Sequence, residues 1–185
     1  MNNQDDKIIR SKILWIVRTA VLIALLIVAQ LATAALGNPL ITGSIVNLLL
    51  VVSVMTCGIA SGLTVAVVSP VLAKLIGIGP LWALIPFIAA GNIVLLLVWY
   101  LIGNRNFGGK KYITYVIALV AAAVAKFAVL YLGIAKIAVP VLLKLPEPQA
   151  TVIGNMFSLP QLFTALIGGA LAVIVFPRLE KIIKR

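Results

Sequence analysis

The chain alternates between long apolar runs and short breaks that carry polar residues, glycine or proline. Six apolar runs stand out: residues 15–36, 45–60, 63–76, 84–102, 112–139 and 151–176. A helix of about 20 apolar residues crosses the hydrocarbon layer of a membrane. The breaks contain turn-forming residues such as Gly37-Asn38-Pro39, and Ser61-Gly62 predicts a tight reversal between the second and third runs. The pattern therefore predicts an all-α membrane protein with six transmembrane helices.

Proline closes the last two runs, at Pro140 and Pro177, because its ring and its missing N–H are disfavoured inside a helix. Six helices with short connections use most of the 185 residues. We therefore expect a single transmembrane domain over residues 12–178, with cytoplasmic tails at 1–11 and 179–185.

The basic balance of the chain supports the same arrangement and sets its orientation. The sequence has 15 Lys and Arg against four Asp and Glu, and no His. Such a charge can indicate nucleic-acid binding, but here most cations flank the first, fourth, fifth and sixth runs. They are Lys7, Arg10, Lys12, Arg18, Arg105, Lys110, Lys111, Arg178, Lys181, Lys184 and Arg185. With six spans all of these fall on one side of the lipid bilayer, as the positive-inside rule requires. We therefore expect both termini in the cytoplasm and no nucleic-acid partner.

The residue types inside the runs argue against an enzyme. Catalysis in a membrane usually needs His, paired carboxylates or a metal site. The four acids, Asp5, Asp6, Glu147 and Glu180, all lie outside the apolar runs, and Cys57 is the sole cysteine. We expect no catalytic residue, no metal site and no cofactor.

The chain also lacks the means to drive transport by itself. Gly108-Gly109-Lys110-Lys111 superficially resembles a phosphate-binding loop, but position 104 is Asn where that motif has glycine, and no strand precedes it. A proton-coupled carrier relies on Asp, Glu or His within its helices, and the runs contain none. If the protein transports a solute uphill, a partner must supply the energy.

Lys126 is the most unusual residue inside the predicted membrane region. It lies fourteen residues into the run 112–139, or about 21 Å along a helix, near the middle of a layer about 30 Å thick. A lysine at that depth costs about 2.5–3.5 kcal/mol unless it meets a cavity, a partner or a ligand. We favour a ligand role, because no acid in the runs can pair with it. The alternatives are a structural lysine held by carbonyl oxygens and contact with another subunit.

Other polar side chains accompany Lys126 toward the outer side. Asn155, Ser158 and Gln161 recur every third residue and are expected along one helix face. Together with Asn47, Asn92, Lys74 and Trp82, they complete the predicted pocket. Each has a structural alternative, since Asn and Gln also join helices and a lysine such as Lys74 can reach the membrane surface from a helix end.

Ala20 and Ala24 form a small-xxx-small pair in the first run. Such pairs allow another helix to approach closely. The approaching helix belongs either to this bundle or to a partner protein.

Taken together, these features resemble the substrate-binding S components of energy-coupling factor (ECF) transporters of bacteria and archaea. The resemblance extends over nearly the whole chain and combines size, span number, topology and the order of short motifs. These are Ala20 with Ala24, Thr42-Gly43-Ser44-Ile45-Val46-Asn47, Ser69-Pro70, Gly77-Ile78-Gly79-Pro80, Phe157-Ser158-Leu159-Pro160-Gln161 and Gly168-Gly169-Ala170.

The resemblance implies a protein of a prokaryotic cell membrane that binds a vitamin or similar micronutrient and docks on a T component with two ATP-binding cassette ATPases. Ala20 and Ala24 would then meet the T component. The solute would sit near the outer face among spans four to six, close to Asn92, Lys126, Asn155 and Gln161. The group most similar to this chain includes pantothenate carriers. The alternatives are a partner-independent channel or secondary carrier, and a structural membrane subunit without a ligand.

Overall fold

The computed structural model describes residues 3–105, 109 and 111–183, and this part of the chain is helical without a strand. Five helical segments are long and apolar enough to cross a membrane. The elements in order are α1 (Asn3–Ala34), α2 (Pro39–Leu75), the short 3₁₀ helix η1 (Trp82–Leu84), α3 (Ile85–Gly103), α4 (Lys111–Leu130), the π-helical η2 (Tyr131–Leu143), α5 (Gln149–Met156) and α6 (Leu159–Ile183).

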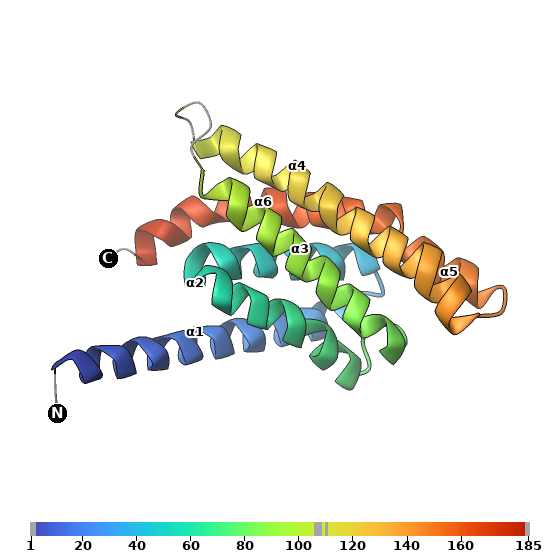
Figure 1. The fold of residues 1–185 in the computed structure, drawn as a ribbon, viewed down its shortest axis with the longest axis horizontal. Helices are drawn as coiled ribbons and strands as arrows, with labels where there is room; N and C mark the ends of the chain where they lie inside the picture. Colours follow the sequence, from blue (N-terminus) through green and yellow to red (C-terminus); the bar gives the residue numbers. More distant parts are fainter. Residues whose placement is uncertain (1–2, 106–108, 110, 184–185) are drawn as a thin grey trace.

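Helix α2 is not straight but folds back on itself at Gly58. Gly58 has φ 83° and ψ 175°, a backbone conformation that is essentially restricted to glycine. A Cβ added at Gly62 would lie 3.0 Å from the Cβ of Val54, although residues eight apart in a straight helix are about 12 Å apart. The two arms of α2 therefore pack against each other (Figure 1).

The predicted reversal was therefore placed a few residues too late. Ser61 and Gly62 lie inside the second arm, where the missing side chain of Gly62 allows the first arm to approach closely. Small residues next to a turn are needed for close packing as well as for bending. The sequence pattern alone does not distinguish the two uses.

The prediction that Pro140 and Pro177 end their helices was wrong. Pro140 lies inside η2, which continues directly from α4, and Pro177 lies inside α6. Helices in membranes tolerate proline because neighbouring groups and local widening of the helix satisfy the freed carbonyl oxygens.

The predicted last span is divided between α5 and α6, so Asn155, Ser158 and Gln161 do not share one helix face. Pro160 lacks the N–H that would donate to the carbonyl oxygen of Met156 in a continuous helix. The side-chain Nε2 of Gln161 donates to that oxygen instead, at 3.1 Å. The break thus follows from proline at the start of α6, where its missing N–H is tolerated.

The first arm of α2 packs closely against α6 through glycines. A Cβ on Gly168 would lie 2.4 Å from the carbonyl oxygen of Ser44, and a Cβ on Gly43 would lie 2.8 Å from the Thr164 side chain. This close approach brings Asn47 to Thr164. The main core, which includes Leu50, Leu96 and Trp99, lies directly beside this contact.

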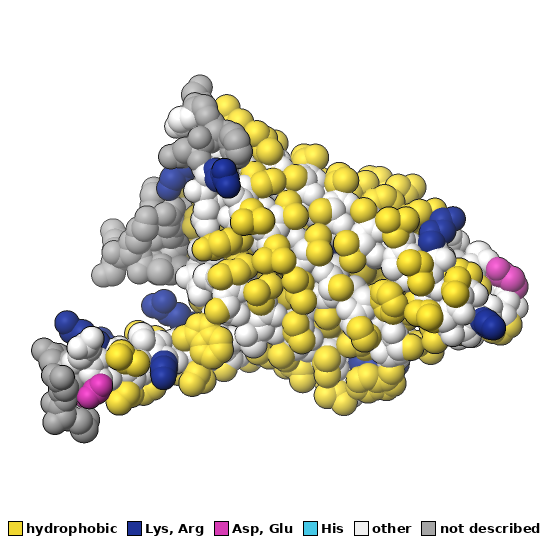
Figure 2. Space-filling model, in the orientation of Figure 1, with side chains coloured by type: hydrophobic (Ala, Val, Ile, Leu, Met, Phe, Trp, Pro, Cys, Tyr) yellow, Lys and Arg dark blue, Asp and Glu magenta, His cyan; other side chains and the backbone are white. Residues whose placement is uncertain are grey.

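The connections lie at two opposite ends of the bundle (Figure 1). The start of α1, the end of α3, the start of α4 and the end of α6 share one end, whereas residues 76–81 and 144–148 lie at the other. Between these ends the visible surface is largely apolar (Figure 2), as expected for a multi-pass membrane protein. The helices extend into both predicted tails, from Asn3 and to Ile183.

Three of the predicted cytoplasmic cations, Lys110, Lys184 and Arg185, lie outside the described residues.

Candidate functional site

Lys126 of α4 is buried at the centre of a polar cluster formed by three helices. Its side chain is 4% exposed. Its Nζ donates to Oδ1 of Asn47 on α2 at 2.6 Å and to Oδ1 of Asn92 on α3 at 2.7 Å. Both distances are short for N–H···O hydrogen bonds. The lysine predicted to lack an acidic partner is thus held by two neutral amide oxygens.

A second layer of hydrogen bonds orients both amides toward Lys126. Asn47 Nδ2 donates to the Thr164 hydroxyl on α6 at 3.3 Å, and Asn92 Nδ2 donates to the carbonyl oxygen of Ala66 on the second arm of α2 at 3.4 Å. Thr164 in turn donates to the carbonyl oxygen of Gln161. Because each amide nitrogen has its own acceptor, each amide oxygen points at the lysine.

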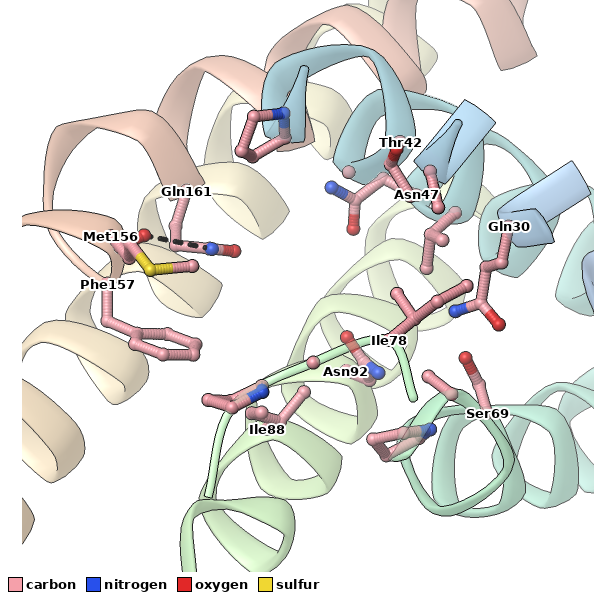
Figure 3. Close-up of a pocket in the computed structure, with 18 of the residues that line it drawn as sticks. Gln30, Thr42, Asn47, Ser69, Ile78, Ile88, Asn92, Met156, Phe157 and Gln161 are labelled. Atoms are coloured by element: carbon pink, nitrogen blue, oxygen red, sulfur yellow. Dashed lines mark hydrogen bonds between the residues drawn. The ribbon is translucent and has the colours of Figure 1, made fainter. Parts of the chain in front are cut away.

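A cavity of about 380 Å³ lies beside this cluster, and Lys126 forms part of its lining. It is bounded by the end of α1, both arms of α2, the connection that includes Ile78 and Gly79, α3 and the junction of α5 with α6 (Figure 3). Ile88, Met156 and Phe157 give it an apolar wall. Buried polar groups converging on an apolar cavity of this size are typical of small-molecule sites.

Four of the predicted site residues line this one cavity: Asn47, Asn92, Lys126 and Gln161. They come from α2, α3, α4 and α6, so only the folded chain brings them together. The half-buried Gln161 also closes the break between α5 and α6 through its bond to Met156.

The other four predicted pocket residues lie elsewhere. Asn155 and Ser158 line a separate, more open groove that also includes Lys136. Trp82 is 55% exposed in η1, and Lys74 lies in the last turn of α2; neither lines the central cavity.

The sequence analysis missed several cavity residues. Gln30 of α1 is 5% exposed, and its Oε1 has no hydrogen-bond partner within the described part of the chain. Ser69, which is 2% exposed, and Thr42 also line the cavity. Gln30 could have been predicted, because it is the one glutamine within the first apolar run. A serine or threonine in such a run is a weaker indication of a binding site.

The cavity also lies partly outside the region that the resemblance implied. It takes much of its lining from α1, α2 and the connection that follows α2, rather than from spans four to six alone. The short motifs quoted for the resemblance surround it, since Thr42, Ser69, Gly79 and Phe157 are all lining residues.

Ala20 and Ala24 lie on an exposed part of α1. The neighbouring Thr19 is buried, and its hydroxyl donates to the Ser61 hydroxyl at 2.8 Å. Thr19 therefore faces the bundle, whereas the two alanines leave space for another helix.

Comparison with known families agrees with this architecture. Residues 15–180 match the family described as "ECF transporter, substrate-specific component". No curated protein and no solved structure matches the chain significantly. Since the family match extends over most of the chain, this multi-pass membrane protein belongs to the substrate-specific components of ECF transporters.

Proposed function

We propose that this chain captures a small anionic solute, of the size and chemistry of pantothenate, in the cavity beside Lys126. It then delivers the solute through a T component that two ATPases power. In this proposal each arm of α2 crosses the membrane, which makes six spans with both termini in the cytoplasm. The cavity then opens toward the outside.

The distribution of charge supports this orientation. One end of the bundle carries the described cations of α1 together with Arg105, Lys111 and Arg178. The positive-inside rule places this end in the cytoplasm. The connection that includes Ile78 and Gly79 lies at the opposite end and lines the cavity. A solute would therefore reach the cavity from outside the cell.

The position of Lys126 between two neutral acceptors is the observation on which the anionic solute depends. A lysine ammonium has three N–H donors, and Asn47 and Asn92 accept two of them. Neither acceptor carries a negative charge, and the acids of the sequence lie outside the apolar runs. The remaining donor and the uncompensated charge suit a carboxylate, while the apolar wall suits the body of a small molecule.

Replacing Lys126 by Met tests this proposal. The purified protein in detergent should bind small carboxylates more tightly than the corresponding primary alcohols, with pantothenate and panthenol as one such pair. Lys126→Met should weaken carboxylate binding by roughly thirtyfold or more, because removing one side of a buried charged hydrogen bond typically costs about 2–5 kcal/mol. Isothermal titration calorimetry measures both effects.

Lys136→Met is the matched control. Lys136 is exposed, lies 5.3 Å from the centre of the Tyr131 ring and does not line the cavity, so this change should leave carboxylate binding intact. Unchanged carboxylate affinity in Lys126→Met, or a preference of the native protein for amines, would contradict the proposed solute class.

A further inference from the structure

Gln30 adds a polar side chain to the cavity lining from α1, a helix that does not contribute to the Lys126 cluster. Its side chain is 5% exposed, yet its Oε1 accepts no hydrogen bond within the described residues. Buried polar atoms in folded proteins are nearly always paired, so an unpaired one calls for an explanation. A buried carbonyl oxygen without a partner destabilises the empty protein.

The position of Gln30 points to the cavity as the place where its partner binds. Gln30 is a lining residue, and Figure 3 shows its amide reaching from α1 toward the space that Ile78 and Ser69 also face. In that view it lies across the cavity from Gln161 and Phe157, with Asn92 between them.

We propose that Gln30 binds an uncharged polar group of the solute, a hydroxyl or an amide, while Lys126 binds its anionic group. This inference rests on the proposed function and extends it from one recognised group to two. An amide side chain offers an N–H donor and a carbonyl acceptor, and a hydroxyl or amide complements both. A second carboxylate fits less well, because the Gln30 oxygen would repel it.

Matched pairs of probes test this assignment. The probes are straight-chain ω-hydroxy carboxylates of increasing length and the same carboxylates without the hydroxyl group. In the full-length protein, one hydroxy acid of suitable length should bind about tenfold more tightly than its partner, the effect of one good hydrogen bond. In Gln30→Met, which keeps the length of the side chain, the two should bind equally.

Thr33→Val is the matched control for Gln30→Met. Thr33 lies one turn further along α1, is buried, donates to the carbonyl oxygen of Ala29 and does not line the cavity. This variant should keep the preference for the hydroxy acid. Without any probe, Gln30→Met should unfold at the same temperature as the native protein or higher, because the change removes an unpaired oxygen.

The outcomes separate this inference from the proposed function. If both acids bind the native protein equally, or if Gln30→Met keeps the preference, the role of Gln30 is refuted and the anionic solute stands. If no carboxylate binds the native protein, the proposed solute class is refuted and the inference fails with it.

Discussion

A single buried lysine organises the polar centre of this protein. An ammonium group within the membrane region needs partners, and Asn47 and Asn92 supply oxygens without supplying charge. This arrangement holds the lysine side chain in place without an acidic partner. In the function proposed above, its charge is then available to the solute. A carboxylate at either position would neutralise the lysine within the protein.

The link between Asn47 and Lys126 can be measured by a double-mutant cycle. Asn47→Leu should lower the free energy of unfolding by about 1.5–3 kcal/mol, the usual contribution of a hydrogen bond to a charged group. In a Lys126→Met background the same change should cost less, because no ammonium is left without its acceptor. Denaturant titration of the purified proteins gives all four values. Equal costs in both backgrounds would mean that this bond does not stabilise the fold.

At the residue level the sequence identifies a lysine deep within an apolar run, but it also predicted Lys74, near a helix end, which does not line the cavity. Lys126 could be identified because any ionised side chain in an apolar run is costly. Asn47, Asn92 and Gln161 also line the cavity, but Asn155 fits the same polar pattern and lies in another groove. Which polar residues share a cavity depends on helix packing, and single-sequence patterns do not contain that information.

Among the elements, α2 contributes most directly to the position of the site, because both of its arms supply residues to it. Its first arm carries Asn47, its second arm carries Ala66 and Ser69, and the turn at Gly58 brings the two arms side by side. The end of α2 leads into the connection that forms part of the cavity lining. The geometry of the site therefore depends on one backbone conformation outside the cavity.

Gly58→Ala should destabilise the protein by about 1–3 kcal/mol, because φ 83° with ψ 175° is strained for any residue with a Cβ. Gly154→Ala is the control, since Gly154 is helical, without a positive φ, and an added Cβ there meets no atom within 4 Å. That change should be neutral or stabilise by about 0.4–1 kcal/mol. Thermal unfolding of both variants tests the difference. Equal stability of the two would contradict the strain assigned to Gly58.

The apolar runs predicted the existence of the helices, and single residues decided their ends. The first helix ends at Ala34 and α3 ends at Gly103, close to the predicted limits. Pro140 and Pro160 have the same chemistry but different effects, since η2 continues through one while the other lies at the start of α6. At Pro140 the chain continues in π-helical geometry, whereas at the break before α6 the Gln161 side chain donates to the freed carbonyl oxygen of Met156.

In the whole molecule, α1 connects the cavity with the outer surface of the bundle. Gln30 lines the cavity near one end of the helix, while Ala20 and Ala24 are exposed closer to its start. Members of this family act as subunits of a larger transporter, so an exposed helix face with small residues is a natural contact for a membrane partner. Binding and delivery of the solute would then depend on different parts of the same helix.

Ala24→Trp should separate these two activities. The added indole should block close approach of another helix and abolish assembly with a T component, while carboxylate binding stays within about twofold of the native value because Ala24 lies outside the cavity. In liposomes the native chain alone should bind without accumulating solute, and should accumulate it only when ATP, the T component and both ATPases are present. Leu25→Trp, a change at an exposed position on a different face of α1 from Ala20 and Ala24, controls for bulk alone. Normal assembly of Ala24→Trp would refute the docking role, and uptake by the native chain alone would refute dependence on partners.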